Sequence, residues 1–402
     1  MNTEKYEIAV VGAGIVGLGT ALALAERYPH LSLVILEKES RVAGHQTSHN
    51  SGVIHAGIYY RPGSYKAKLC VEGVRLLKDF CQENGVRYDL CGKVIVAAGG
   101  DERQRLQALY ERGKANGIAG LEMIGPERLR EIEPHARAVQ ALYSPGTAIV
   151  DFSAVAAAMA KKLTDRGVRI QTGSRVRAIH RRDGLLHLEA GISPVTARNL
   201  ISCGGLYSDC IARMMGLNPG ITIIPFRGEY FTLRPECKLV RGLIYPVPDP
   251  QFPFLGVHFT KKISGGFEAG PNAVLAFARE GYGKWNIHWG ELGRMLAYRG
   301  FWAMGRRYWR MGFYEYYRSF SRSAFLVALQ KLVPELQGQD MAPGGSGVRA
   351  QAVTSSGSLV DDFQIVEAPN AIHVLNAPSP AATASLAIGR HIANLAGSAF
   401  GL

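Results

Sequence analysis

The chain has 402 residues, of which 47% are hydrophobic and 20% charged, a composition typical of a globular protein with two domains or one large discontinuous domain. Its formal net charge of +13 admits nucleic acid, an anionic membrane surface or an anionic substrate as a partner. No nucleic-acid-binding motif accompanies the charge, so we expect no nucleic-acid partner. No uncharged run of about 18 residues occurs, which excludes a membrane-spanning helix.

The cysteine pattern and the N-terminus predict a cytoplasmic protein. None of the six cysteines belongs to a C-x-x-C pair, so neither a zinc ribbon nor a redox dithiol is indicated, and we expect no metal. The first predicted strand follows Met1 almost at once, with no signal-peptide pattern before it. We therefore expect reduced cysteines.

The first 37 residues have the pattern of a dinucleotide-binding βαβ unit. An apolar strand over 6–11 leads into a glycine turn, a helix over 15–27 and a second strand over 31–36. In such a unit the first glycine permits the sharp turn, the second admits a pyrophosphate, and the third lets helix and strand pack closely. The N-terminus of the helix also favours phosphate binding. The turn consists of Gly12, Ala13, Gly14, Ile15, Val16 and Gly17, and Glu37 can accept hydrogen bonds from ribose hydroxyls.

Only one such fingerprint is present. An enzyme that binds both a flavin and a nicotinamide usually needs two sites, and a simple nicotinamide dehydrogenase would continue with closely spaced parallel strands. A polar, histidine-containing loop over 44–63 follows instead. The single fingerprint in a long chain with a large β-rich insertion therefore favours FAD over NAD.

The rest of the chain alternates between helical and β-type segments bounded by glycine, proline and capping residues. Helices are predicted over 65–84, from Asp101 to Gly117, from Pro126 to Pro134, over 154–166 and 206–215, and from Ala381 to Ala396. Strands are predicted over 86–90, 93–98, 168–172, 175–182, 185–190, 195–202, 348–353, 363–367 and 371–376. The segment 221–280 is rich in β-branched and aromatic residues and is expected to form an antiparallel sheet.

These elements predict an α/β protein with two interleaved domains. The FAD-binding domain is expected to be Rossmann-like, of the glutathione-reductase type, because strand 195–202 and the C-terminal strands can join the sheet that begins with strand 6–11. It would comprise residues 1–88, 149–215 and 340–402. Residues 89–148 and 216–339 would form an α+β substrate domain built on an antiparallel sheet.

Residues 285–333 of that second domain are expected to be helical and carry an unusual mixture of side chains. Basic residues between Lys284 and Lys331 are interleaved with tryptophan, tyrosine and phenylalanine, and only Glu291 and Glu315 oppose them. Such a segment can lie in a membrane interface. Its aromatic residues can equally well pack on the body of the protein, and both interpretations stay open.

The loop after Glu37 carries a specific resemblance. The stretch from His45 to Tyr60, HQTSHNSGVIHAGIYY, resembles the signature of the L-2-hydroxyglutarate oxidases and dehydrogenases. These belong to the FAD-dependent family that includes the D-amino-acid, glycine and sarcosine oxidases. Further matching blocks span nearly the whole chain, at 225–231, 254–260, 269–277, 347–352 and 376–383. The segments 261–267, 285–325 and 343–347 depart from the family pattern, which leaves the substrate access route and the acceptor contacts open.

The resemblance implies an FAD-dependent 2-hydroxy-acid dehydrogenase or oxidase that converts L-2-hydroxyglutarate into 2-oxoglutarate. The hydride would pass to the flavin, and the electrons then to a quinone of the respiratory chain or to O2. Bacterial members look membrane-associated, so the chain could lie peripherally on the cytoplasmic face of the inner membrane. The resemblance also implies a set of cofactor contacts, which are Lys38, Thr47, Ser48, Asn50, Ser51, Val176, Cys203, Gly204, Arg349, Pro380, Ala381, Ala382 and Thr383.

Oxidation of a 2-hydroxy dicarboxylate requires a base for the hydroxyl proton and cations for the carboxylates. A histidine suits the base role near neutral pH, and we favour His258 as the base and His55 as the residue that orients substrate or flavin. Arg227 and Arg349 can each grip a carboxylate with two parallel hydrogen bonds. Weaker candidates for substrate binding are Tyr60, Tyr230 and Lys261.

Three alternatives stay open at this point. A related FAD amino-acid or amine oxidase, of the glycine- or sarcosine-oxidase kind, would place an acid in the pocket to bind the amine. A non-enzymatic basic flavoprotein would not be reduced by any small acid. A nicotinamide dehydrogenase is disfavoured by the single fingerprint and by the loop that follows it.

Overall fold

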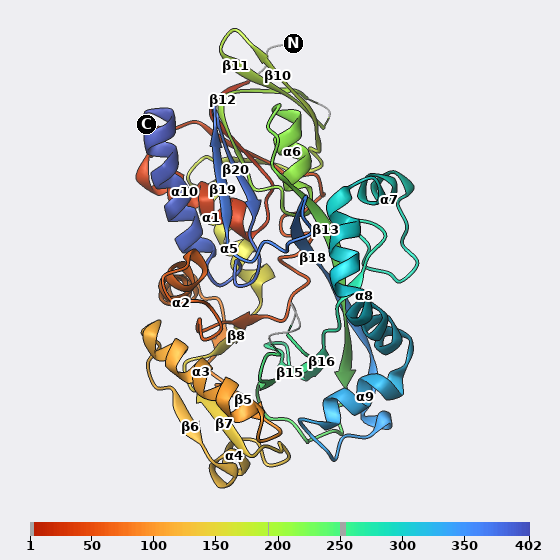
Figure 1. The fold of residues 1–402 in the computed structure, drawn as a ribbon. Coiled ribbons are helices and arrows are strands. Elements are labelled where there is room, and N and C mark those ends of the chain that lie inside the picture. The colour runs from red at the N-terminus through yellow and green to blue at the C-terminus, as the bar shows by residue number, and fades with distance from the viewer. Residues whose placement is uncertain (1–3, 192, 250–254) are drawn as a thin grey trace.

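The computed structural model describes residues 4–191, 193–249 and 255–402, and its strands form two large sheets and one small one. Figure 1 shows the first sheet in the upper half of the molecule and much of the second below it. Phe254, the first residue of the sequence block at 254–260, lies outside the described residues.

The first sheet has eight strands and is built on the predicted βαβ unit. Its parallel part runs β20-β12-β1-β2-β9, and the strands β10, β11 and β19 add antiparallel pairs. The central strands are almost wholly apolar and buried, as expected for parallel strands covered on both faces. Their bounds are β1 Lys5–Val11, β2 Leu33–Leu36, β9 Arg169–Gln171, β10 Val176–Arg182, β11 Leu185–Ala190, β12 Val195–Ser202, β19 Gln364–Ala368 and β20 Ala371–Asn376.

Four helices pack against one face of the first sheet and share one apolar core with Ile8, Val10 and Ile35. The opposite face carries Ala9, Val11 and residues of β10, β11 and α6. The alternation along β1 thus divides the sheet between two cores. The four helices are α1 Ile15–Arg27, α2 Tyr65–Glu83, α5 Phe152–Asp165 and α10 Ser385–Phe400, and α6 spans Ser208–Met214.

The second sheet has nine strands and is mostly antiparallel, in agreement with the prediction for 221–280. Its one parallel pair joins β14 to β5. The strands β5, β6 and β7 lie within residues 93–144 and the other strands of this sheet within residues 221–354, so residues far apart in sequence share the sheet. Their bounds are β5 Lys93–Ala97, β6 Glu122–Ile124, β7 Gln140–Ser144, β13 Ile221–Leu233, β14 Ile244–Pro246, β15 His258–Lys261, β16 Phe267–Gly270, β17 Val274–Leu275 and β18 Met341–Thr354.

Strand β18 corrects one prediction. The strand expected over 348–353 was assigned to the FAD-binding sheet, but it begins at Met341 and pairs along β13 in the second sheet. The first half of β18 was not predicted because it is rich in glycine. Glycine is required there, since β18 lies so close to β13 that a Cβ on Gly344 would lie 2.7 Å from the carbonyl oxygen of Tyr230. Residues 341–354 therefore belong to the second sheet.

Several other bounds shift by a few residues. The strand predicted over 86–90 shortens to β4 Tyr88–Asp89, which joins β3 Val53–Ile54 and β8 Ala148–Val150 in the small sheet. The helix predicted over 206–215 starts with a 3-10 turn, Gly205–Tyr207, and α10 begins at Ser385 rather than Ala381 because residues 381–384 form a turn. The remaining helices are α3 Glu102–Ala115 and α4 Pro126–Ile132, and a 3-10 turn spans Gly338–Asp340.

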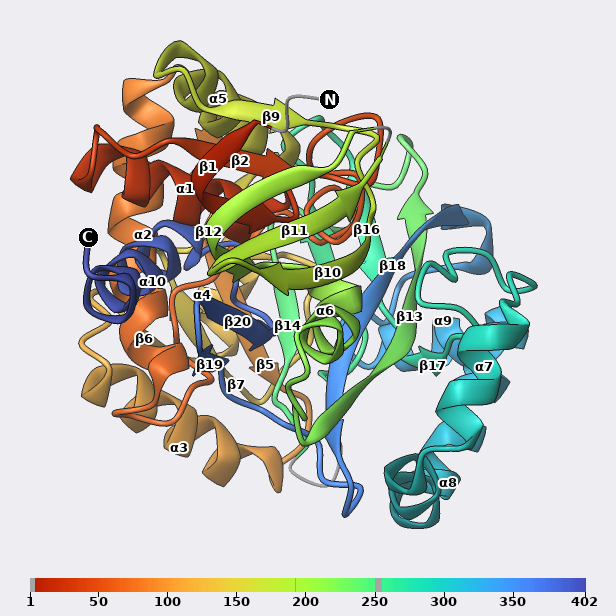
Figure 2. The same ribbon diagram turned by 90° about the horizontal axis from the view of Figure 1, so that it is seen from above.

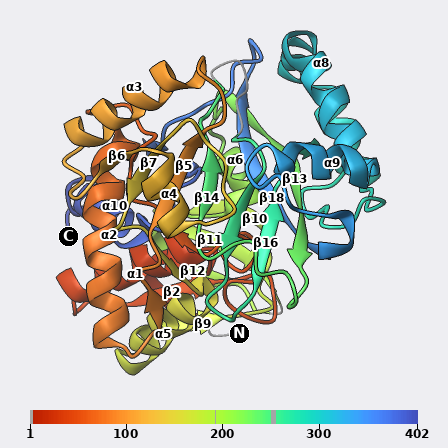
Figure 3. The same cartoon turned by 90° about the horizontal axis from the view of Figure 1, so that it is seen from below.

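The aromatic and basic segment forms three helices at the edge of the molecule. They are α7 Trp289–Leu296, α8 Arg299–Phe320 and α9 Arg322–Gln330. In Figure 2 and Figure 3 they lie on the side away from α1 and α10, and α8 projects from the body. Within the described part of the chain, none of the helices combines the length and the apolar character needed to cross a membrane.

Candidate active site

A cavity of about 730 Å³ runs between the two large sheets. It begins at the carboxyl ends of β1 and β2, passes the loop 44–55, and ends against β13, β18 and the turn before α10. Its size lies in the range of cofactor and ligand sites, and its position at the ends of parallel strands is where open α/β sheets bind ligands.

The glycine turn has a geometry that only glycine allows. Gly12 has a φ of +103°, and a Cβ there would lie 2.6 Å from the carbonyl oxygen of Cys203. A Cβ on Gly17 would lie 1.9 Å from the carbonyl oxygen of Gly12. The backbone of α1 is therefore packed directly on the turn, which leaves the helix N-terminus open to the cavity, as a pyrophosphate requires.

Thr47 and Glu37 complete this cradle. The N–H of Ile15 donates to Oγ1 of Thr47 at 3.0 Å, which fixes the loop over the N-terminus of α1. The buried Glu37 carboxylate accepts from the N–H of Ala13 at 2.8 Å and from the N–H of Glu39 at 2.9 Å, one on each oxygen. Each carboxylate oxygen can accept a second hydrogen bond, so Glu37 keeps its capacity for ribose hydroxyls.

Most of the predicted cofactor contacts line the cavity. Two do not appear among the described residues of its wall. Ala13 donates to Glu37, and the Ser48 hydroxyl bonds to the carbonyl oxygen of His45 and to His49. The predicted residues that do line it are Gly12, Gly14, Ile15, Val16, Gly17, Glu37, Lys38, Thr47, Asn50, Ser51, Val176, Cys203, Gly204, Arg349, Pro380, Ala381, Ala382 and Thr383.

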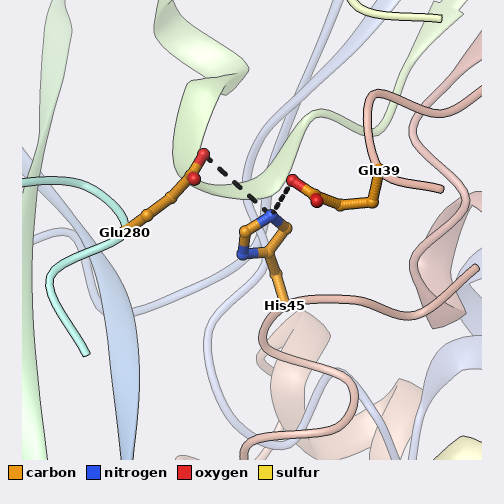
Figure 4. A group of neighbouring side chains, drawn as sticks. All are labelled: Glu39, His45 and Glu280. Atoms are coloured by element: carbon orange, nitrogen blue, oxygen red, sulfur yellow. Dashed lines mark hydrogen bonds and ion pairs between the residues drawn. The ribbon is translucent and has the colours of Figure 1, made fainter. Parts of the chain in front are cut away.

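Lys38 is the centre of a charged cluster at the cavity rim. Figure 4 shows Glu39, His45 and Glu280, whose ligand atoms lie close enough together to hold a metal ion. The Lys38 Nζ already lies among them, 2.6 Å from Nε2 of His45 and 2.7 Å from Oε1 of Glu280, and it pairs with Glu39. The ammonium group of Lys38 therefore occupies the position that a metal ion would take.

The same cluster connects the two large sheets by an ion pair between Lys38 and Glu280. Glu280 follows β17, whereas Lys38 and Glu39 follow β2. Burial alone would raise the pKa of Glu280, but hydrogen bonds from Lys38 and Tyr207 outweigh it and lower that pKa. Sequence reasoning missed Glu280, because nothing along the chain connects it with Lys38.

The two predicted histidines differ in their access to the cavity. His55 lines it, and its backbone N–H donates to Oγ1 of Thr383 at 3.1 Å. His258 is buried on β15, is absent from the described residues of the wall, and stacks on the Tyr245 ring at 3.9 Å between ring centres. Burial lowers the pKa of His55 to about 3 and that of His258 to about 4, and each imidazole is further disfavoured as a cation by the charge of Lys93.

Hydrogen bonding fixes the tautomer of His258. Its Nδ1 lies 2.9 Å from the carbonyl oxygen of Gly256. A carbonyl oxygen can only accept, so Nδ1 carries the hydrogen and the neutral ring keeps its lone pair on Nε2. His55 differs, because its Nδ1 is buried without a hydrogen-bond partner among the described residues.

The two predicted arginines lie in different surroundings. Arg349 lines the cavity. Arg227 is buried beneath the wall, where Nε and Nη2 donate to Oε1 of Glu229 and Nη1 donates to the carbonyl oxygen of Gly283. The structure therefore brings Arg349 to the site and gives Arg227 an internal partner.

The three weaker candidates for substrate binding differ in whether they line the cavity. Tyr230 lines the cavity, and burial raises the pKa of its hydroxyl, so this group stays a neutral hydrogen-bonding partner. Lys261 pairs with Asp89 at 2.7 Å and is absent from the described residues of the wall. Tyr60 is absent as well, and burial raises its pKa well above the usual value.

The structure adds Lys93 to the site region, which sequence reasoning missed. Lys93 begins β5 and is 2% exposed, although the strand reads KVIVA and every other member is apolar. Its Nζ lies 4.7 Å from the ring centre of Tyr59 and 5.1 Å from that of Tyr245. The sequence did offer a signal for Lys93, because a lysine at the start of an otherwise apolar, wholly buried strand is rare.

A cavity that starts at a dinucleotide cradle and has Arg349 and His55 in its wall defines a class, the oxidoreductases that hold a dinucleotide cofactor. The glycine cradle and Glu37 fit such a cofactor directly. The chain belongs to the family described as FAD dependent oxidoreductase, which matches residues 7–395. Its cofactor is accordingly FAD.

Named relatives cover nearly the whole chain. The chain is 47% identical to the L-2-hydroxyglutarate dehydrogenase of Indibacter alkaliphilus over 96% of its own length and 97% of that protein. It is 46% identical to the Escherichia coli K12 enzyme of the same name, covering 96% and 92%. The human mitochondrial L-2-hydroxyglutarate dehydrogenase is 44% identical, covering 98% and 89%.

Solved structures confirm the fold. The L-alpha-glycerophosphate oxidase of Mycoplasma pneumoniae, solved with FAD bound, is similar with a TM-score of 0.80 at 23% identity, covering 98% of this chain and 94% of that one. Glycine oxidase from Geobacillus kaustophilus gives a TM-score of 0.72 at 18% identity, covering 98% and 95%. At these identities the likeness concerns the fold alone.

Proposed function

We propose that this protein oxidises L-2-hydroxyglutarate to 2-oxoglutarate. The observation that carries the proposal is the 44–47% identity over nearly the full length to enzymes named for that substrate. The cavity supports it, because its wall contains both Arg349, which can pair with a carboxylate by two hydrogen bonds, and the imidazole of His55.

The chain's own residues divide the work of the reaction. Bound FAD supplies the acceptor for the hydride that leaves the substrate Cα. Arg349 holds a carboxylate, and a neutral imidazole takes the hydroxyl proton, so that loss of one hydride and one proton converts the alcohol to the ketone. His55 is better placed for this contact than His258, because His55 lines the cavity. His258 lies behind the wall and positions the site.

The function is tested by flavin reduction without oxygen. Purified protein should show the visible spectrum of FAD, and that spectrum should bleach with L-2-hydroxyglutarate but not with the D-enantiomer. Glycine is the third arm, because bleaching by glycine would favour an amine oxidase. A spectrum that stays unbleached with L-2-hydroxyglutarate contradicts the proposal.

The histidine assignment is tested by comparing His55→Asn with His258→Asn. We expect His55→Asn to lower the rate of flavin reduction by about 100-fold or more, the usual contribution of a general base. His258→Asn should cost less and should retain bound FAD. The reverse ranking would return the base role to His258.

The electron acceptor is proposed to be a quinone, reached at a membrane surface through α8. The outward face of α8 presents Trp302, Arg306, Trp309, Phe313, Tyr317 and Phe320, whose spacing places them on one stripe of the helix. Trp309 is 55% exposed and Phe313 72% exposed. Exposed aromatic side chains beside arginines suit the interface of an anionic bilayer.

This interface is tested by flotation with liposomes that contain anionic lipid. The triple variant Arg306→Glu/Arg307→Glu/Arg310→Glu should lose binding, because each reversed charge removes an attraction of about 1 kcal/mol and adds a repulsion. A matched control, Arg75→Glu/Lys161→Glu/Arg166→Glu, makes the same charge change on α2, on α5 and just after α5, and it should bind normally. Equal binding by both variants contradicts the proposal.

The acceptor itself is distinguished by reoxidation of the reduced enzyme. A quinone analogue should reoxidise it much faster than dissolved oxygen does. Faster reoxidation by oxygen would identify an oxidase instead. The position on the cytoplasmic face of the inner membrane stays a prediction.

A further inference from the structure

A buried ammonium group lies near the histidine pair. Lys93 is 2% exposed, and its Nζ faces the rings of Tyr59 and Tyr245. Within the described residues, this Nζ is surrounded by these two rings and the Cys70 thiol, and none of these groups is a carboxylate. Aromatic faces thus take the role that a counter-ion usually has.

The same aromatic ring joins Lys93 to His258. The Tyr245 ring centre lies 5.1 Å from Nζ of Lys93 and 3.9 Å from the ring centre of His258, which places the ammonium at most about 9 Å from the imidazole. The electrostatic influence of Lys93 reaches both His258 and His55. The charge of Lys93 therefore acts on both histidines, and the ring of Tyr245 lies close to both the lysine and His258.

Among the described residues, two cations act on the histidine pair, Lys93 and Arg349. Arg349 from β18 acts on His258, and Cys70 from α2 lies beside Lys93. Burial raises the pKa of the Cys70 thiol to about 12, so it stays neutral. The hydroxyls of Tyr59, Tyr60, Tyr230 and Tyr245 also stay neutral, because burial raises their pKa values.

A large cost accompanies this arrangement, which indicates a role beyond packing. A buried ammonium without an anionic partner is unfavourable, and a methionine would fill the same space without that penalty. The hydroxyl of Tyr59 nearby is buried without a hydrogen-bond partner among the described residues, and the hydroxyl of Tyr245 faces Thr260 and Ser51. Unsatisfied buried polar groups gather at functional sites.

We propose that Lys93 is a positioning residue whose buried positive charge adds to the effect of burial in keeping His55 and His258 neutral, so that the cavity imidazole is ready to take the substrate hydroxyl proton over a wider range of pH. This inference rests on the proposed function, since it assigns the proton acceptor to the histidine pair. A cation nearby disfavours the imidazolium by direct repulsion. It acts before substrate binds and needs no contact with substrate.

The first test is the pH profile of kcat/KM for flavin reduction, which reports the free enzyme. In Lys93→Met the acid limb should move to higher pH, because the imidazolium is no longer disfavoured by that charge. One charge at about 9 Å, the upper bound for the distance to His258, shifts a pKa by about one unit in an effective dielectric of about 20. At a pH below both limbs this is about a tenfold loss. The substrate's own carboxyl groups titrate identically with every variant, so the difference between variants stands.

Two variants serve as controls. Lys93→Arg keeps the charge and should leave the acid limb in place, which a purely steric role would not predict. Lys78→Met removes a half-buried lysine on α2 that bonds to the carbonyl oxygen of Gly146, and it should leave the profile unchanged. An acid limb in Lys93→Met that coincides with that of the natural protein overturns the proposal.

A second measurement needs neither a variant nor substrate. Histidine labelled with 13C should show, in the holoenzyme, a chemical-shift step of the His55 and His258 rings as Lys93 loses its proton near pH 8. Histidine shifts that stay constant between about pH 7 and pH 9 would overturn the proposal. This readout holds even if L-2-hydroxyglutarate fails to reduce the flavin, so failure of the function and failure of the inference can be told apart.

Discussion

Arg227 and Glu229 form a buried ion pair in which Nε and Nη2 of the arginine donate to the same carboxylate oxygen at 3.1 and 3.0 Å. The other oxygen of Glu229 accepts from Nδ2 of Asn272 at 2.9 Å and from the Ser319 hydroxyl at 2.6 Å. This pair therefore joins β13 to the loop before β17 and to α8, and its role is structural.

Arg227→Lys is accordingly expected to weaken the fold more than the chemistry. Lysine cannot form both hydrogen bonds from one planar group, so the free energy of unfolding should fall by about 1–3 kcal/mol. The KM for L-2-hydroxyglutarate should change by less than about threefold, because Arg227 is absent from the described cavity wall. Denaturant unfolding and steady-state kinetics check the two statements, and a large rise in KM with unchanged stability would restore Arg227 to the substrate site.

Arg349→Lys is expected to show the opposite pattern. Arg349 faces the cavity, so loss of its bidentate geometry should raise KM by about tenfold or more, equivalent to about 1.4 kcal/mol of binding. The visible spectrum should still show bound FAD, which separates a substrate defect from a cofactor defect. An unchanged KM would exclude Arg349 as the carboxylate partner.

The comparison of Arg227 with Arg349 also marks the limit of sequence reasoning. Both arginines stood in blocks that resemble the family, and both could pair with a carboxylate. The βαβ unit was predictable because Gly12, Gly17 and Glu37 act within one local segment. The pairing of Arg227 was not, because Glu229 lies on the same face of β13 but is held toward the arginine by Asn272 and Ser319, which come from other elements.

Long-range packing explains the other misses. Strand β18 was assigned to the wrong sheet, because its glycine-rich start has no strand propensity and is extended only by its pairing along β13. Lys93 was missed because its importance comes from Tyr59, Tyr245 and the histidines, which lie on other elements. More of the residues predicted from local patterns therefore line the cavity near the βαβ unit than near β13 and β15.

Gly17→Ala should abolish FAD binding. A Cβ at this position would lie 1.9 Å from the carbonyl oxygen of Gly12, so α1 would have to move off the turn that receives the pyrophosphate. We expect colourless protein after purification and a large loss of stability. Gly305→Ala on α8 is the matched control, because its Cβ would meet open space, and it should keep FAD and gain up to about 1 kcal/mol of stability.

His373 makes stability depend on pH without taking part in the reaction. It is fully buried on β20, both ring nitrogens lack hydrogen-bond partners among the described residues, and burial lowers its pKa to about 4. The unfolded chain therefore binds more protons than the folded one between about pH 4 and pH 6.5, and stability is lost as the pH falls through this range.

His373→Leu should remove that loss. The gain in the free energy of unfolding should be larger at pH 5 than at pH 8, by about 2 kcal/mol at most. The exposed His180 in the same sheet provides the control, since His180→Leu should change stability little at either pH. Urea unfolding at the two pH values measures both, and an equal gain at pH 5 and pH 8 would contradict this account.

Lys93→Met should make the protein more stable while it impairs the reaction at low pH. Burial lowers the pKa of Lys93 from 10.5 to about 8, so at pH 7 the folded protein carries an ammonium that the unfolded chain holds at lower free energy. The unfolded chain binds more protons between about pH 8 and pH 10.5, and stability therefore rises with pH through this range. Removing the amine should add about 2 kcal/mol at pH 7, after allowance for the lost contacts with Tyr59 and Tyr245, and the gain should vanish above about pH 10. Denaturant unfolding across this range measures the gain, and a variant that is less stable at pH 7 would show that the lysine is held for packing instead.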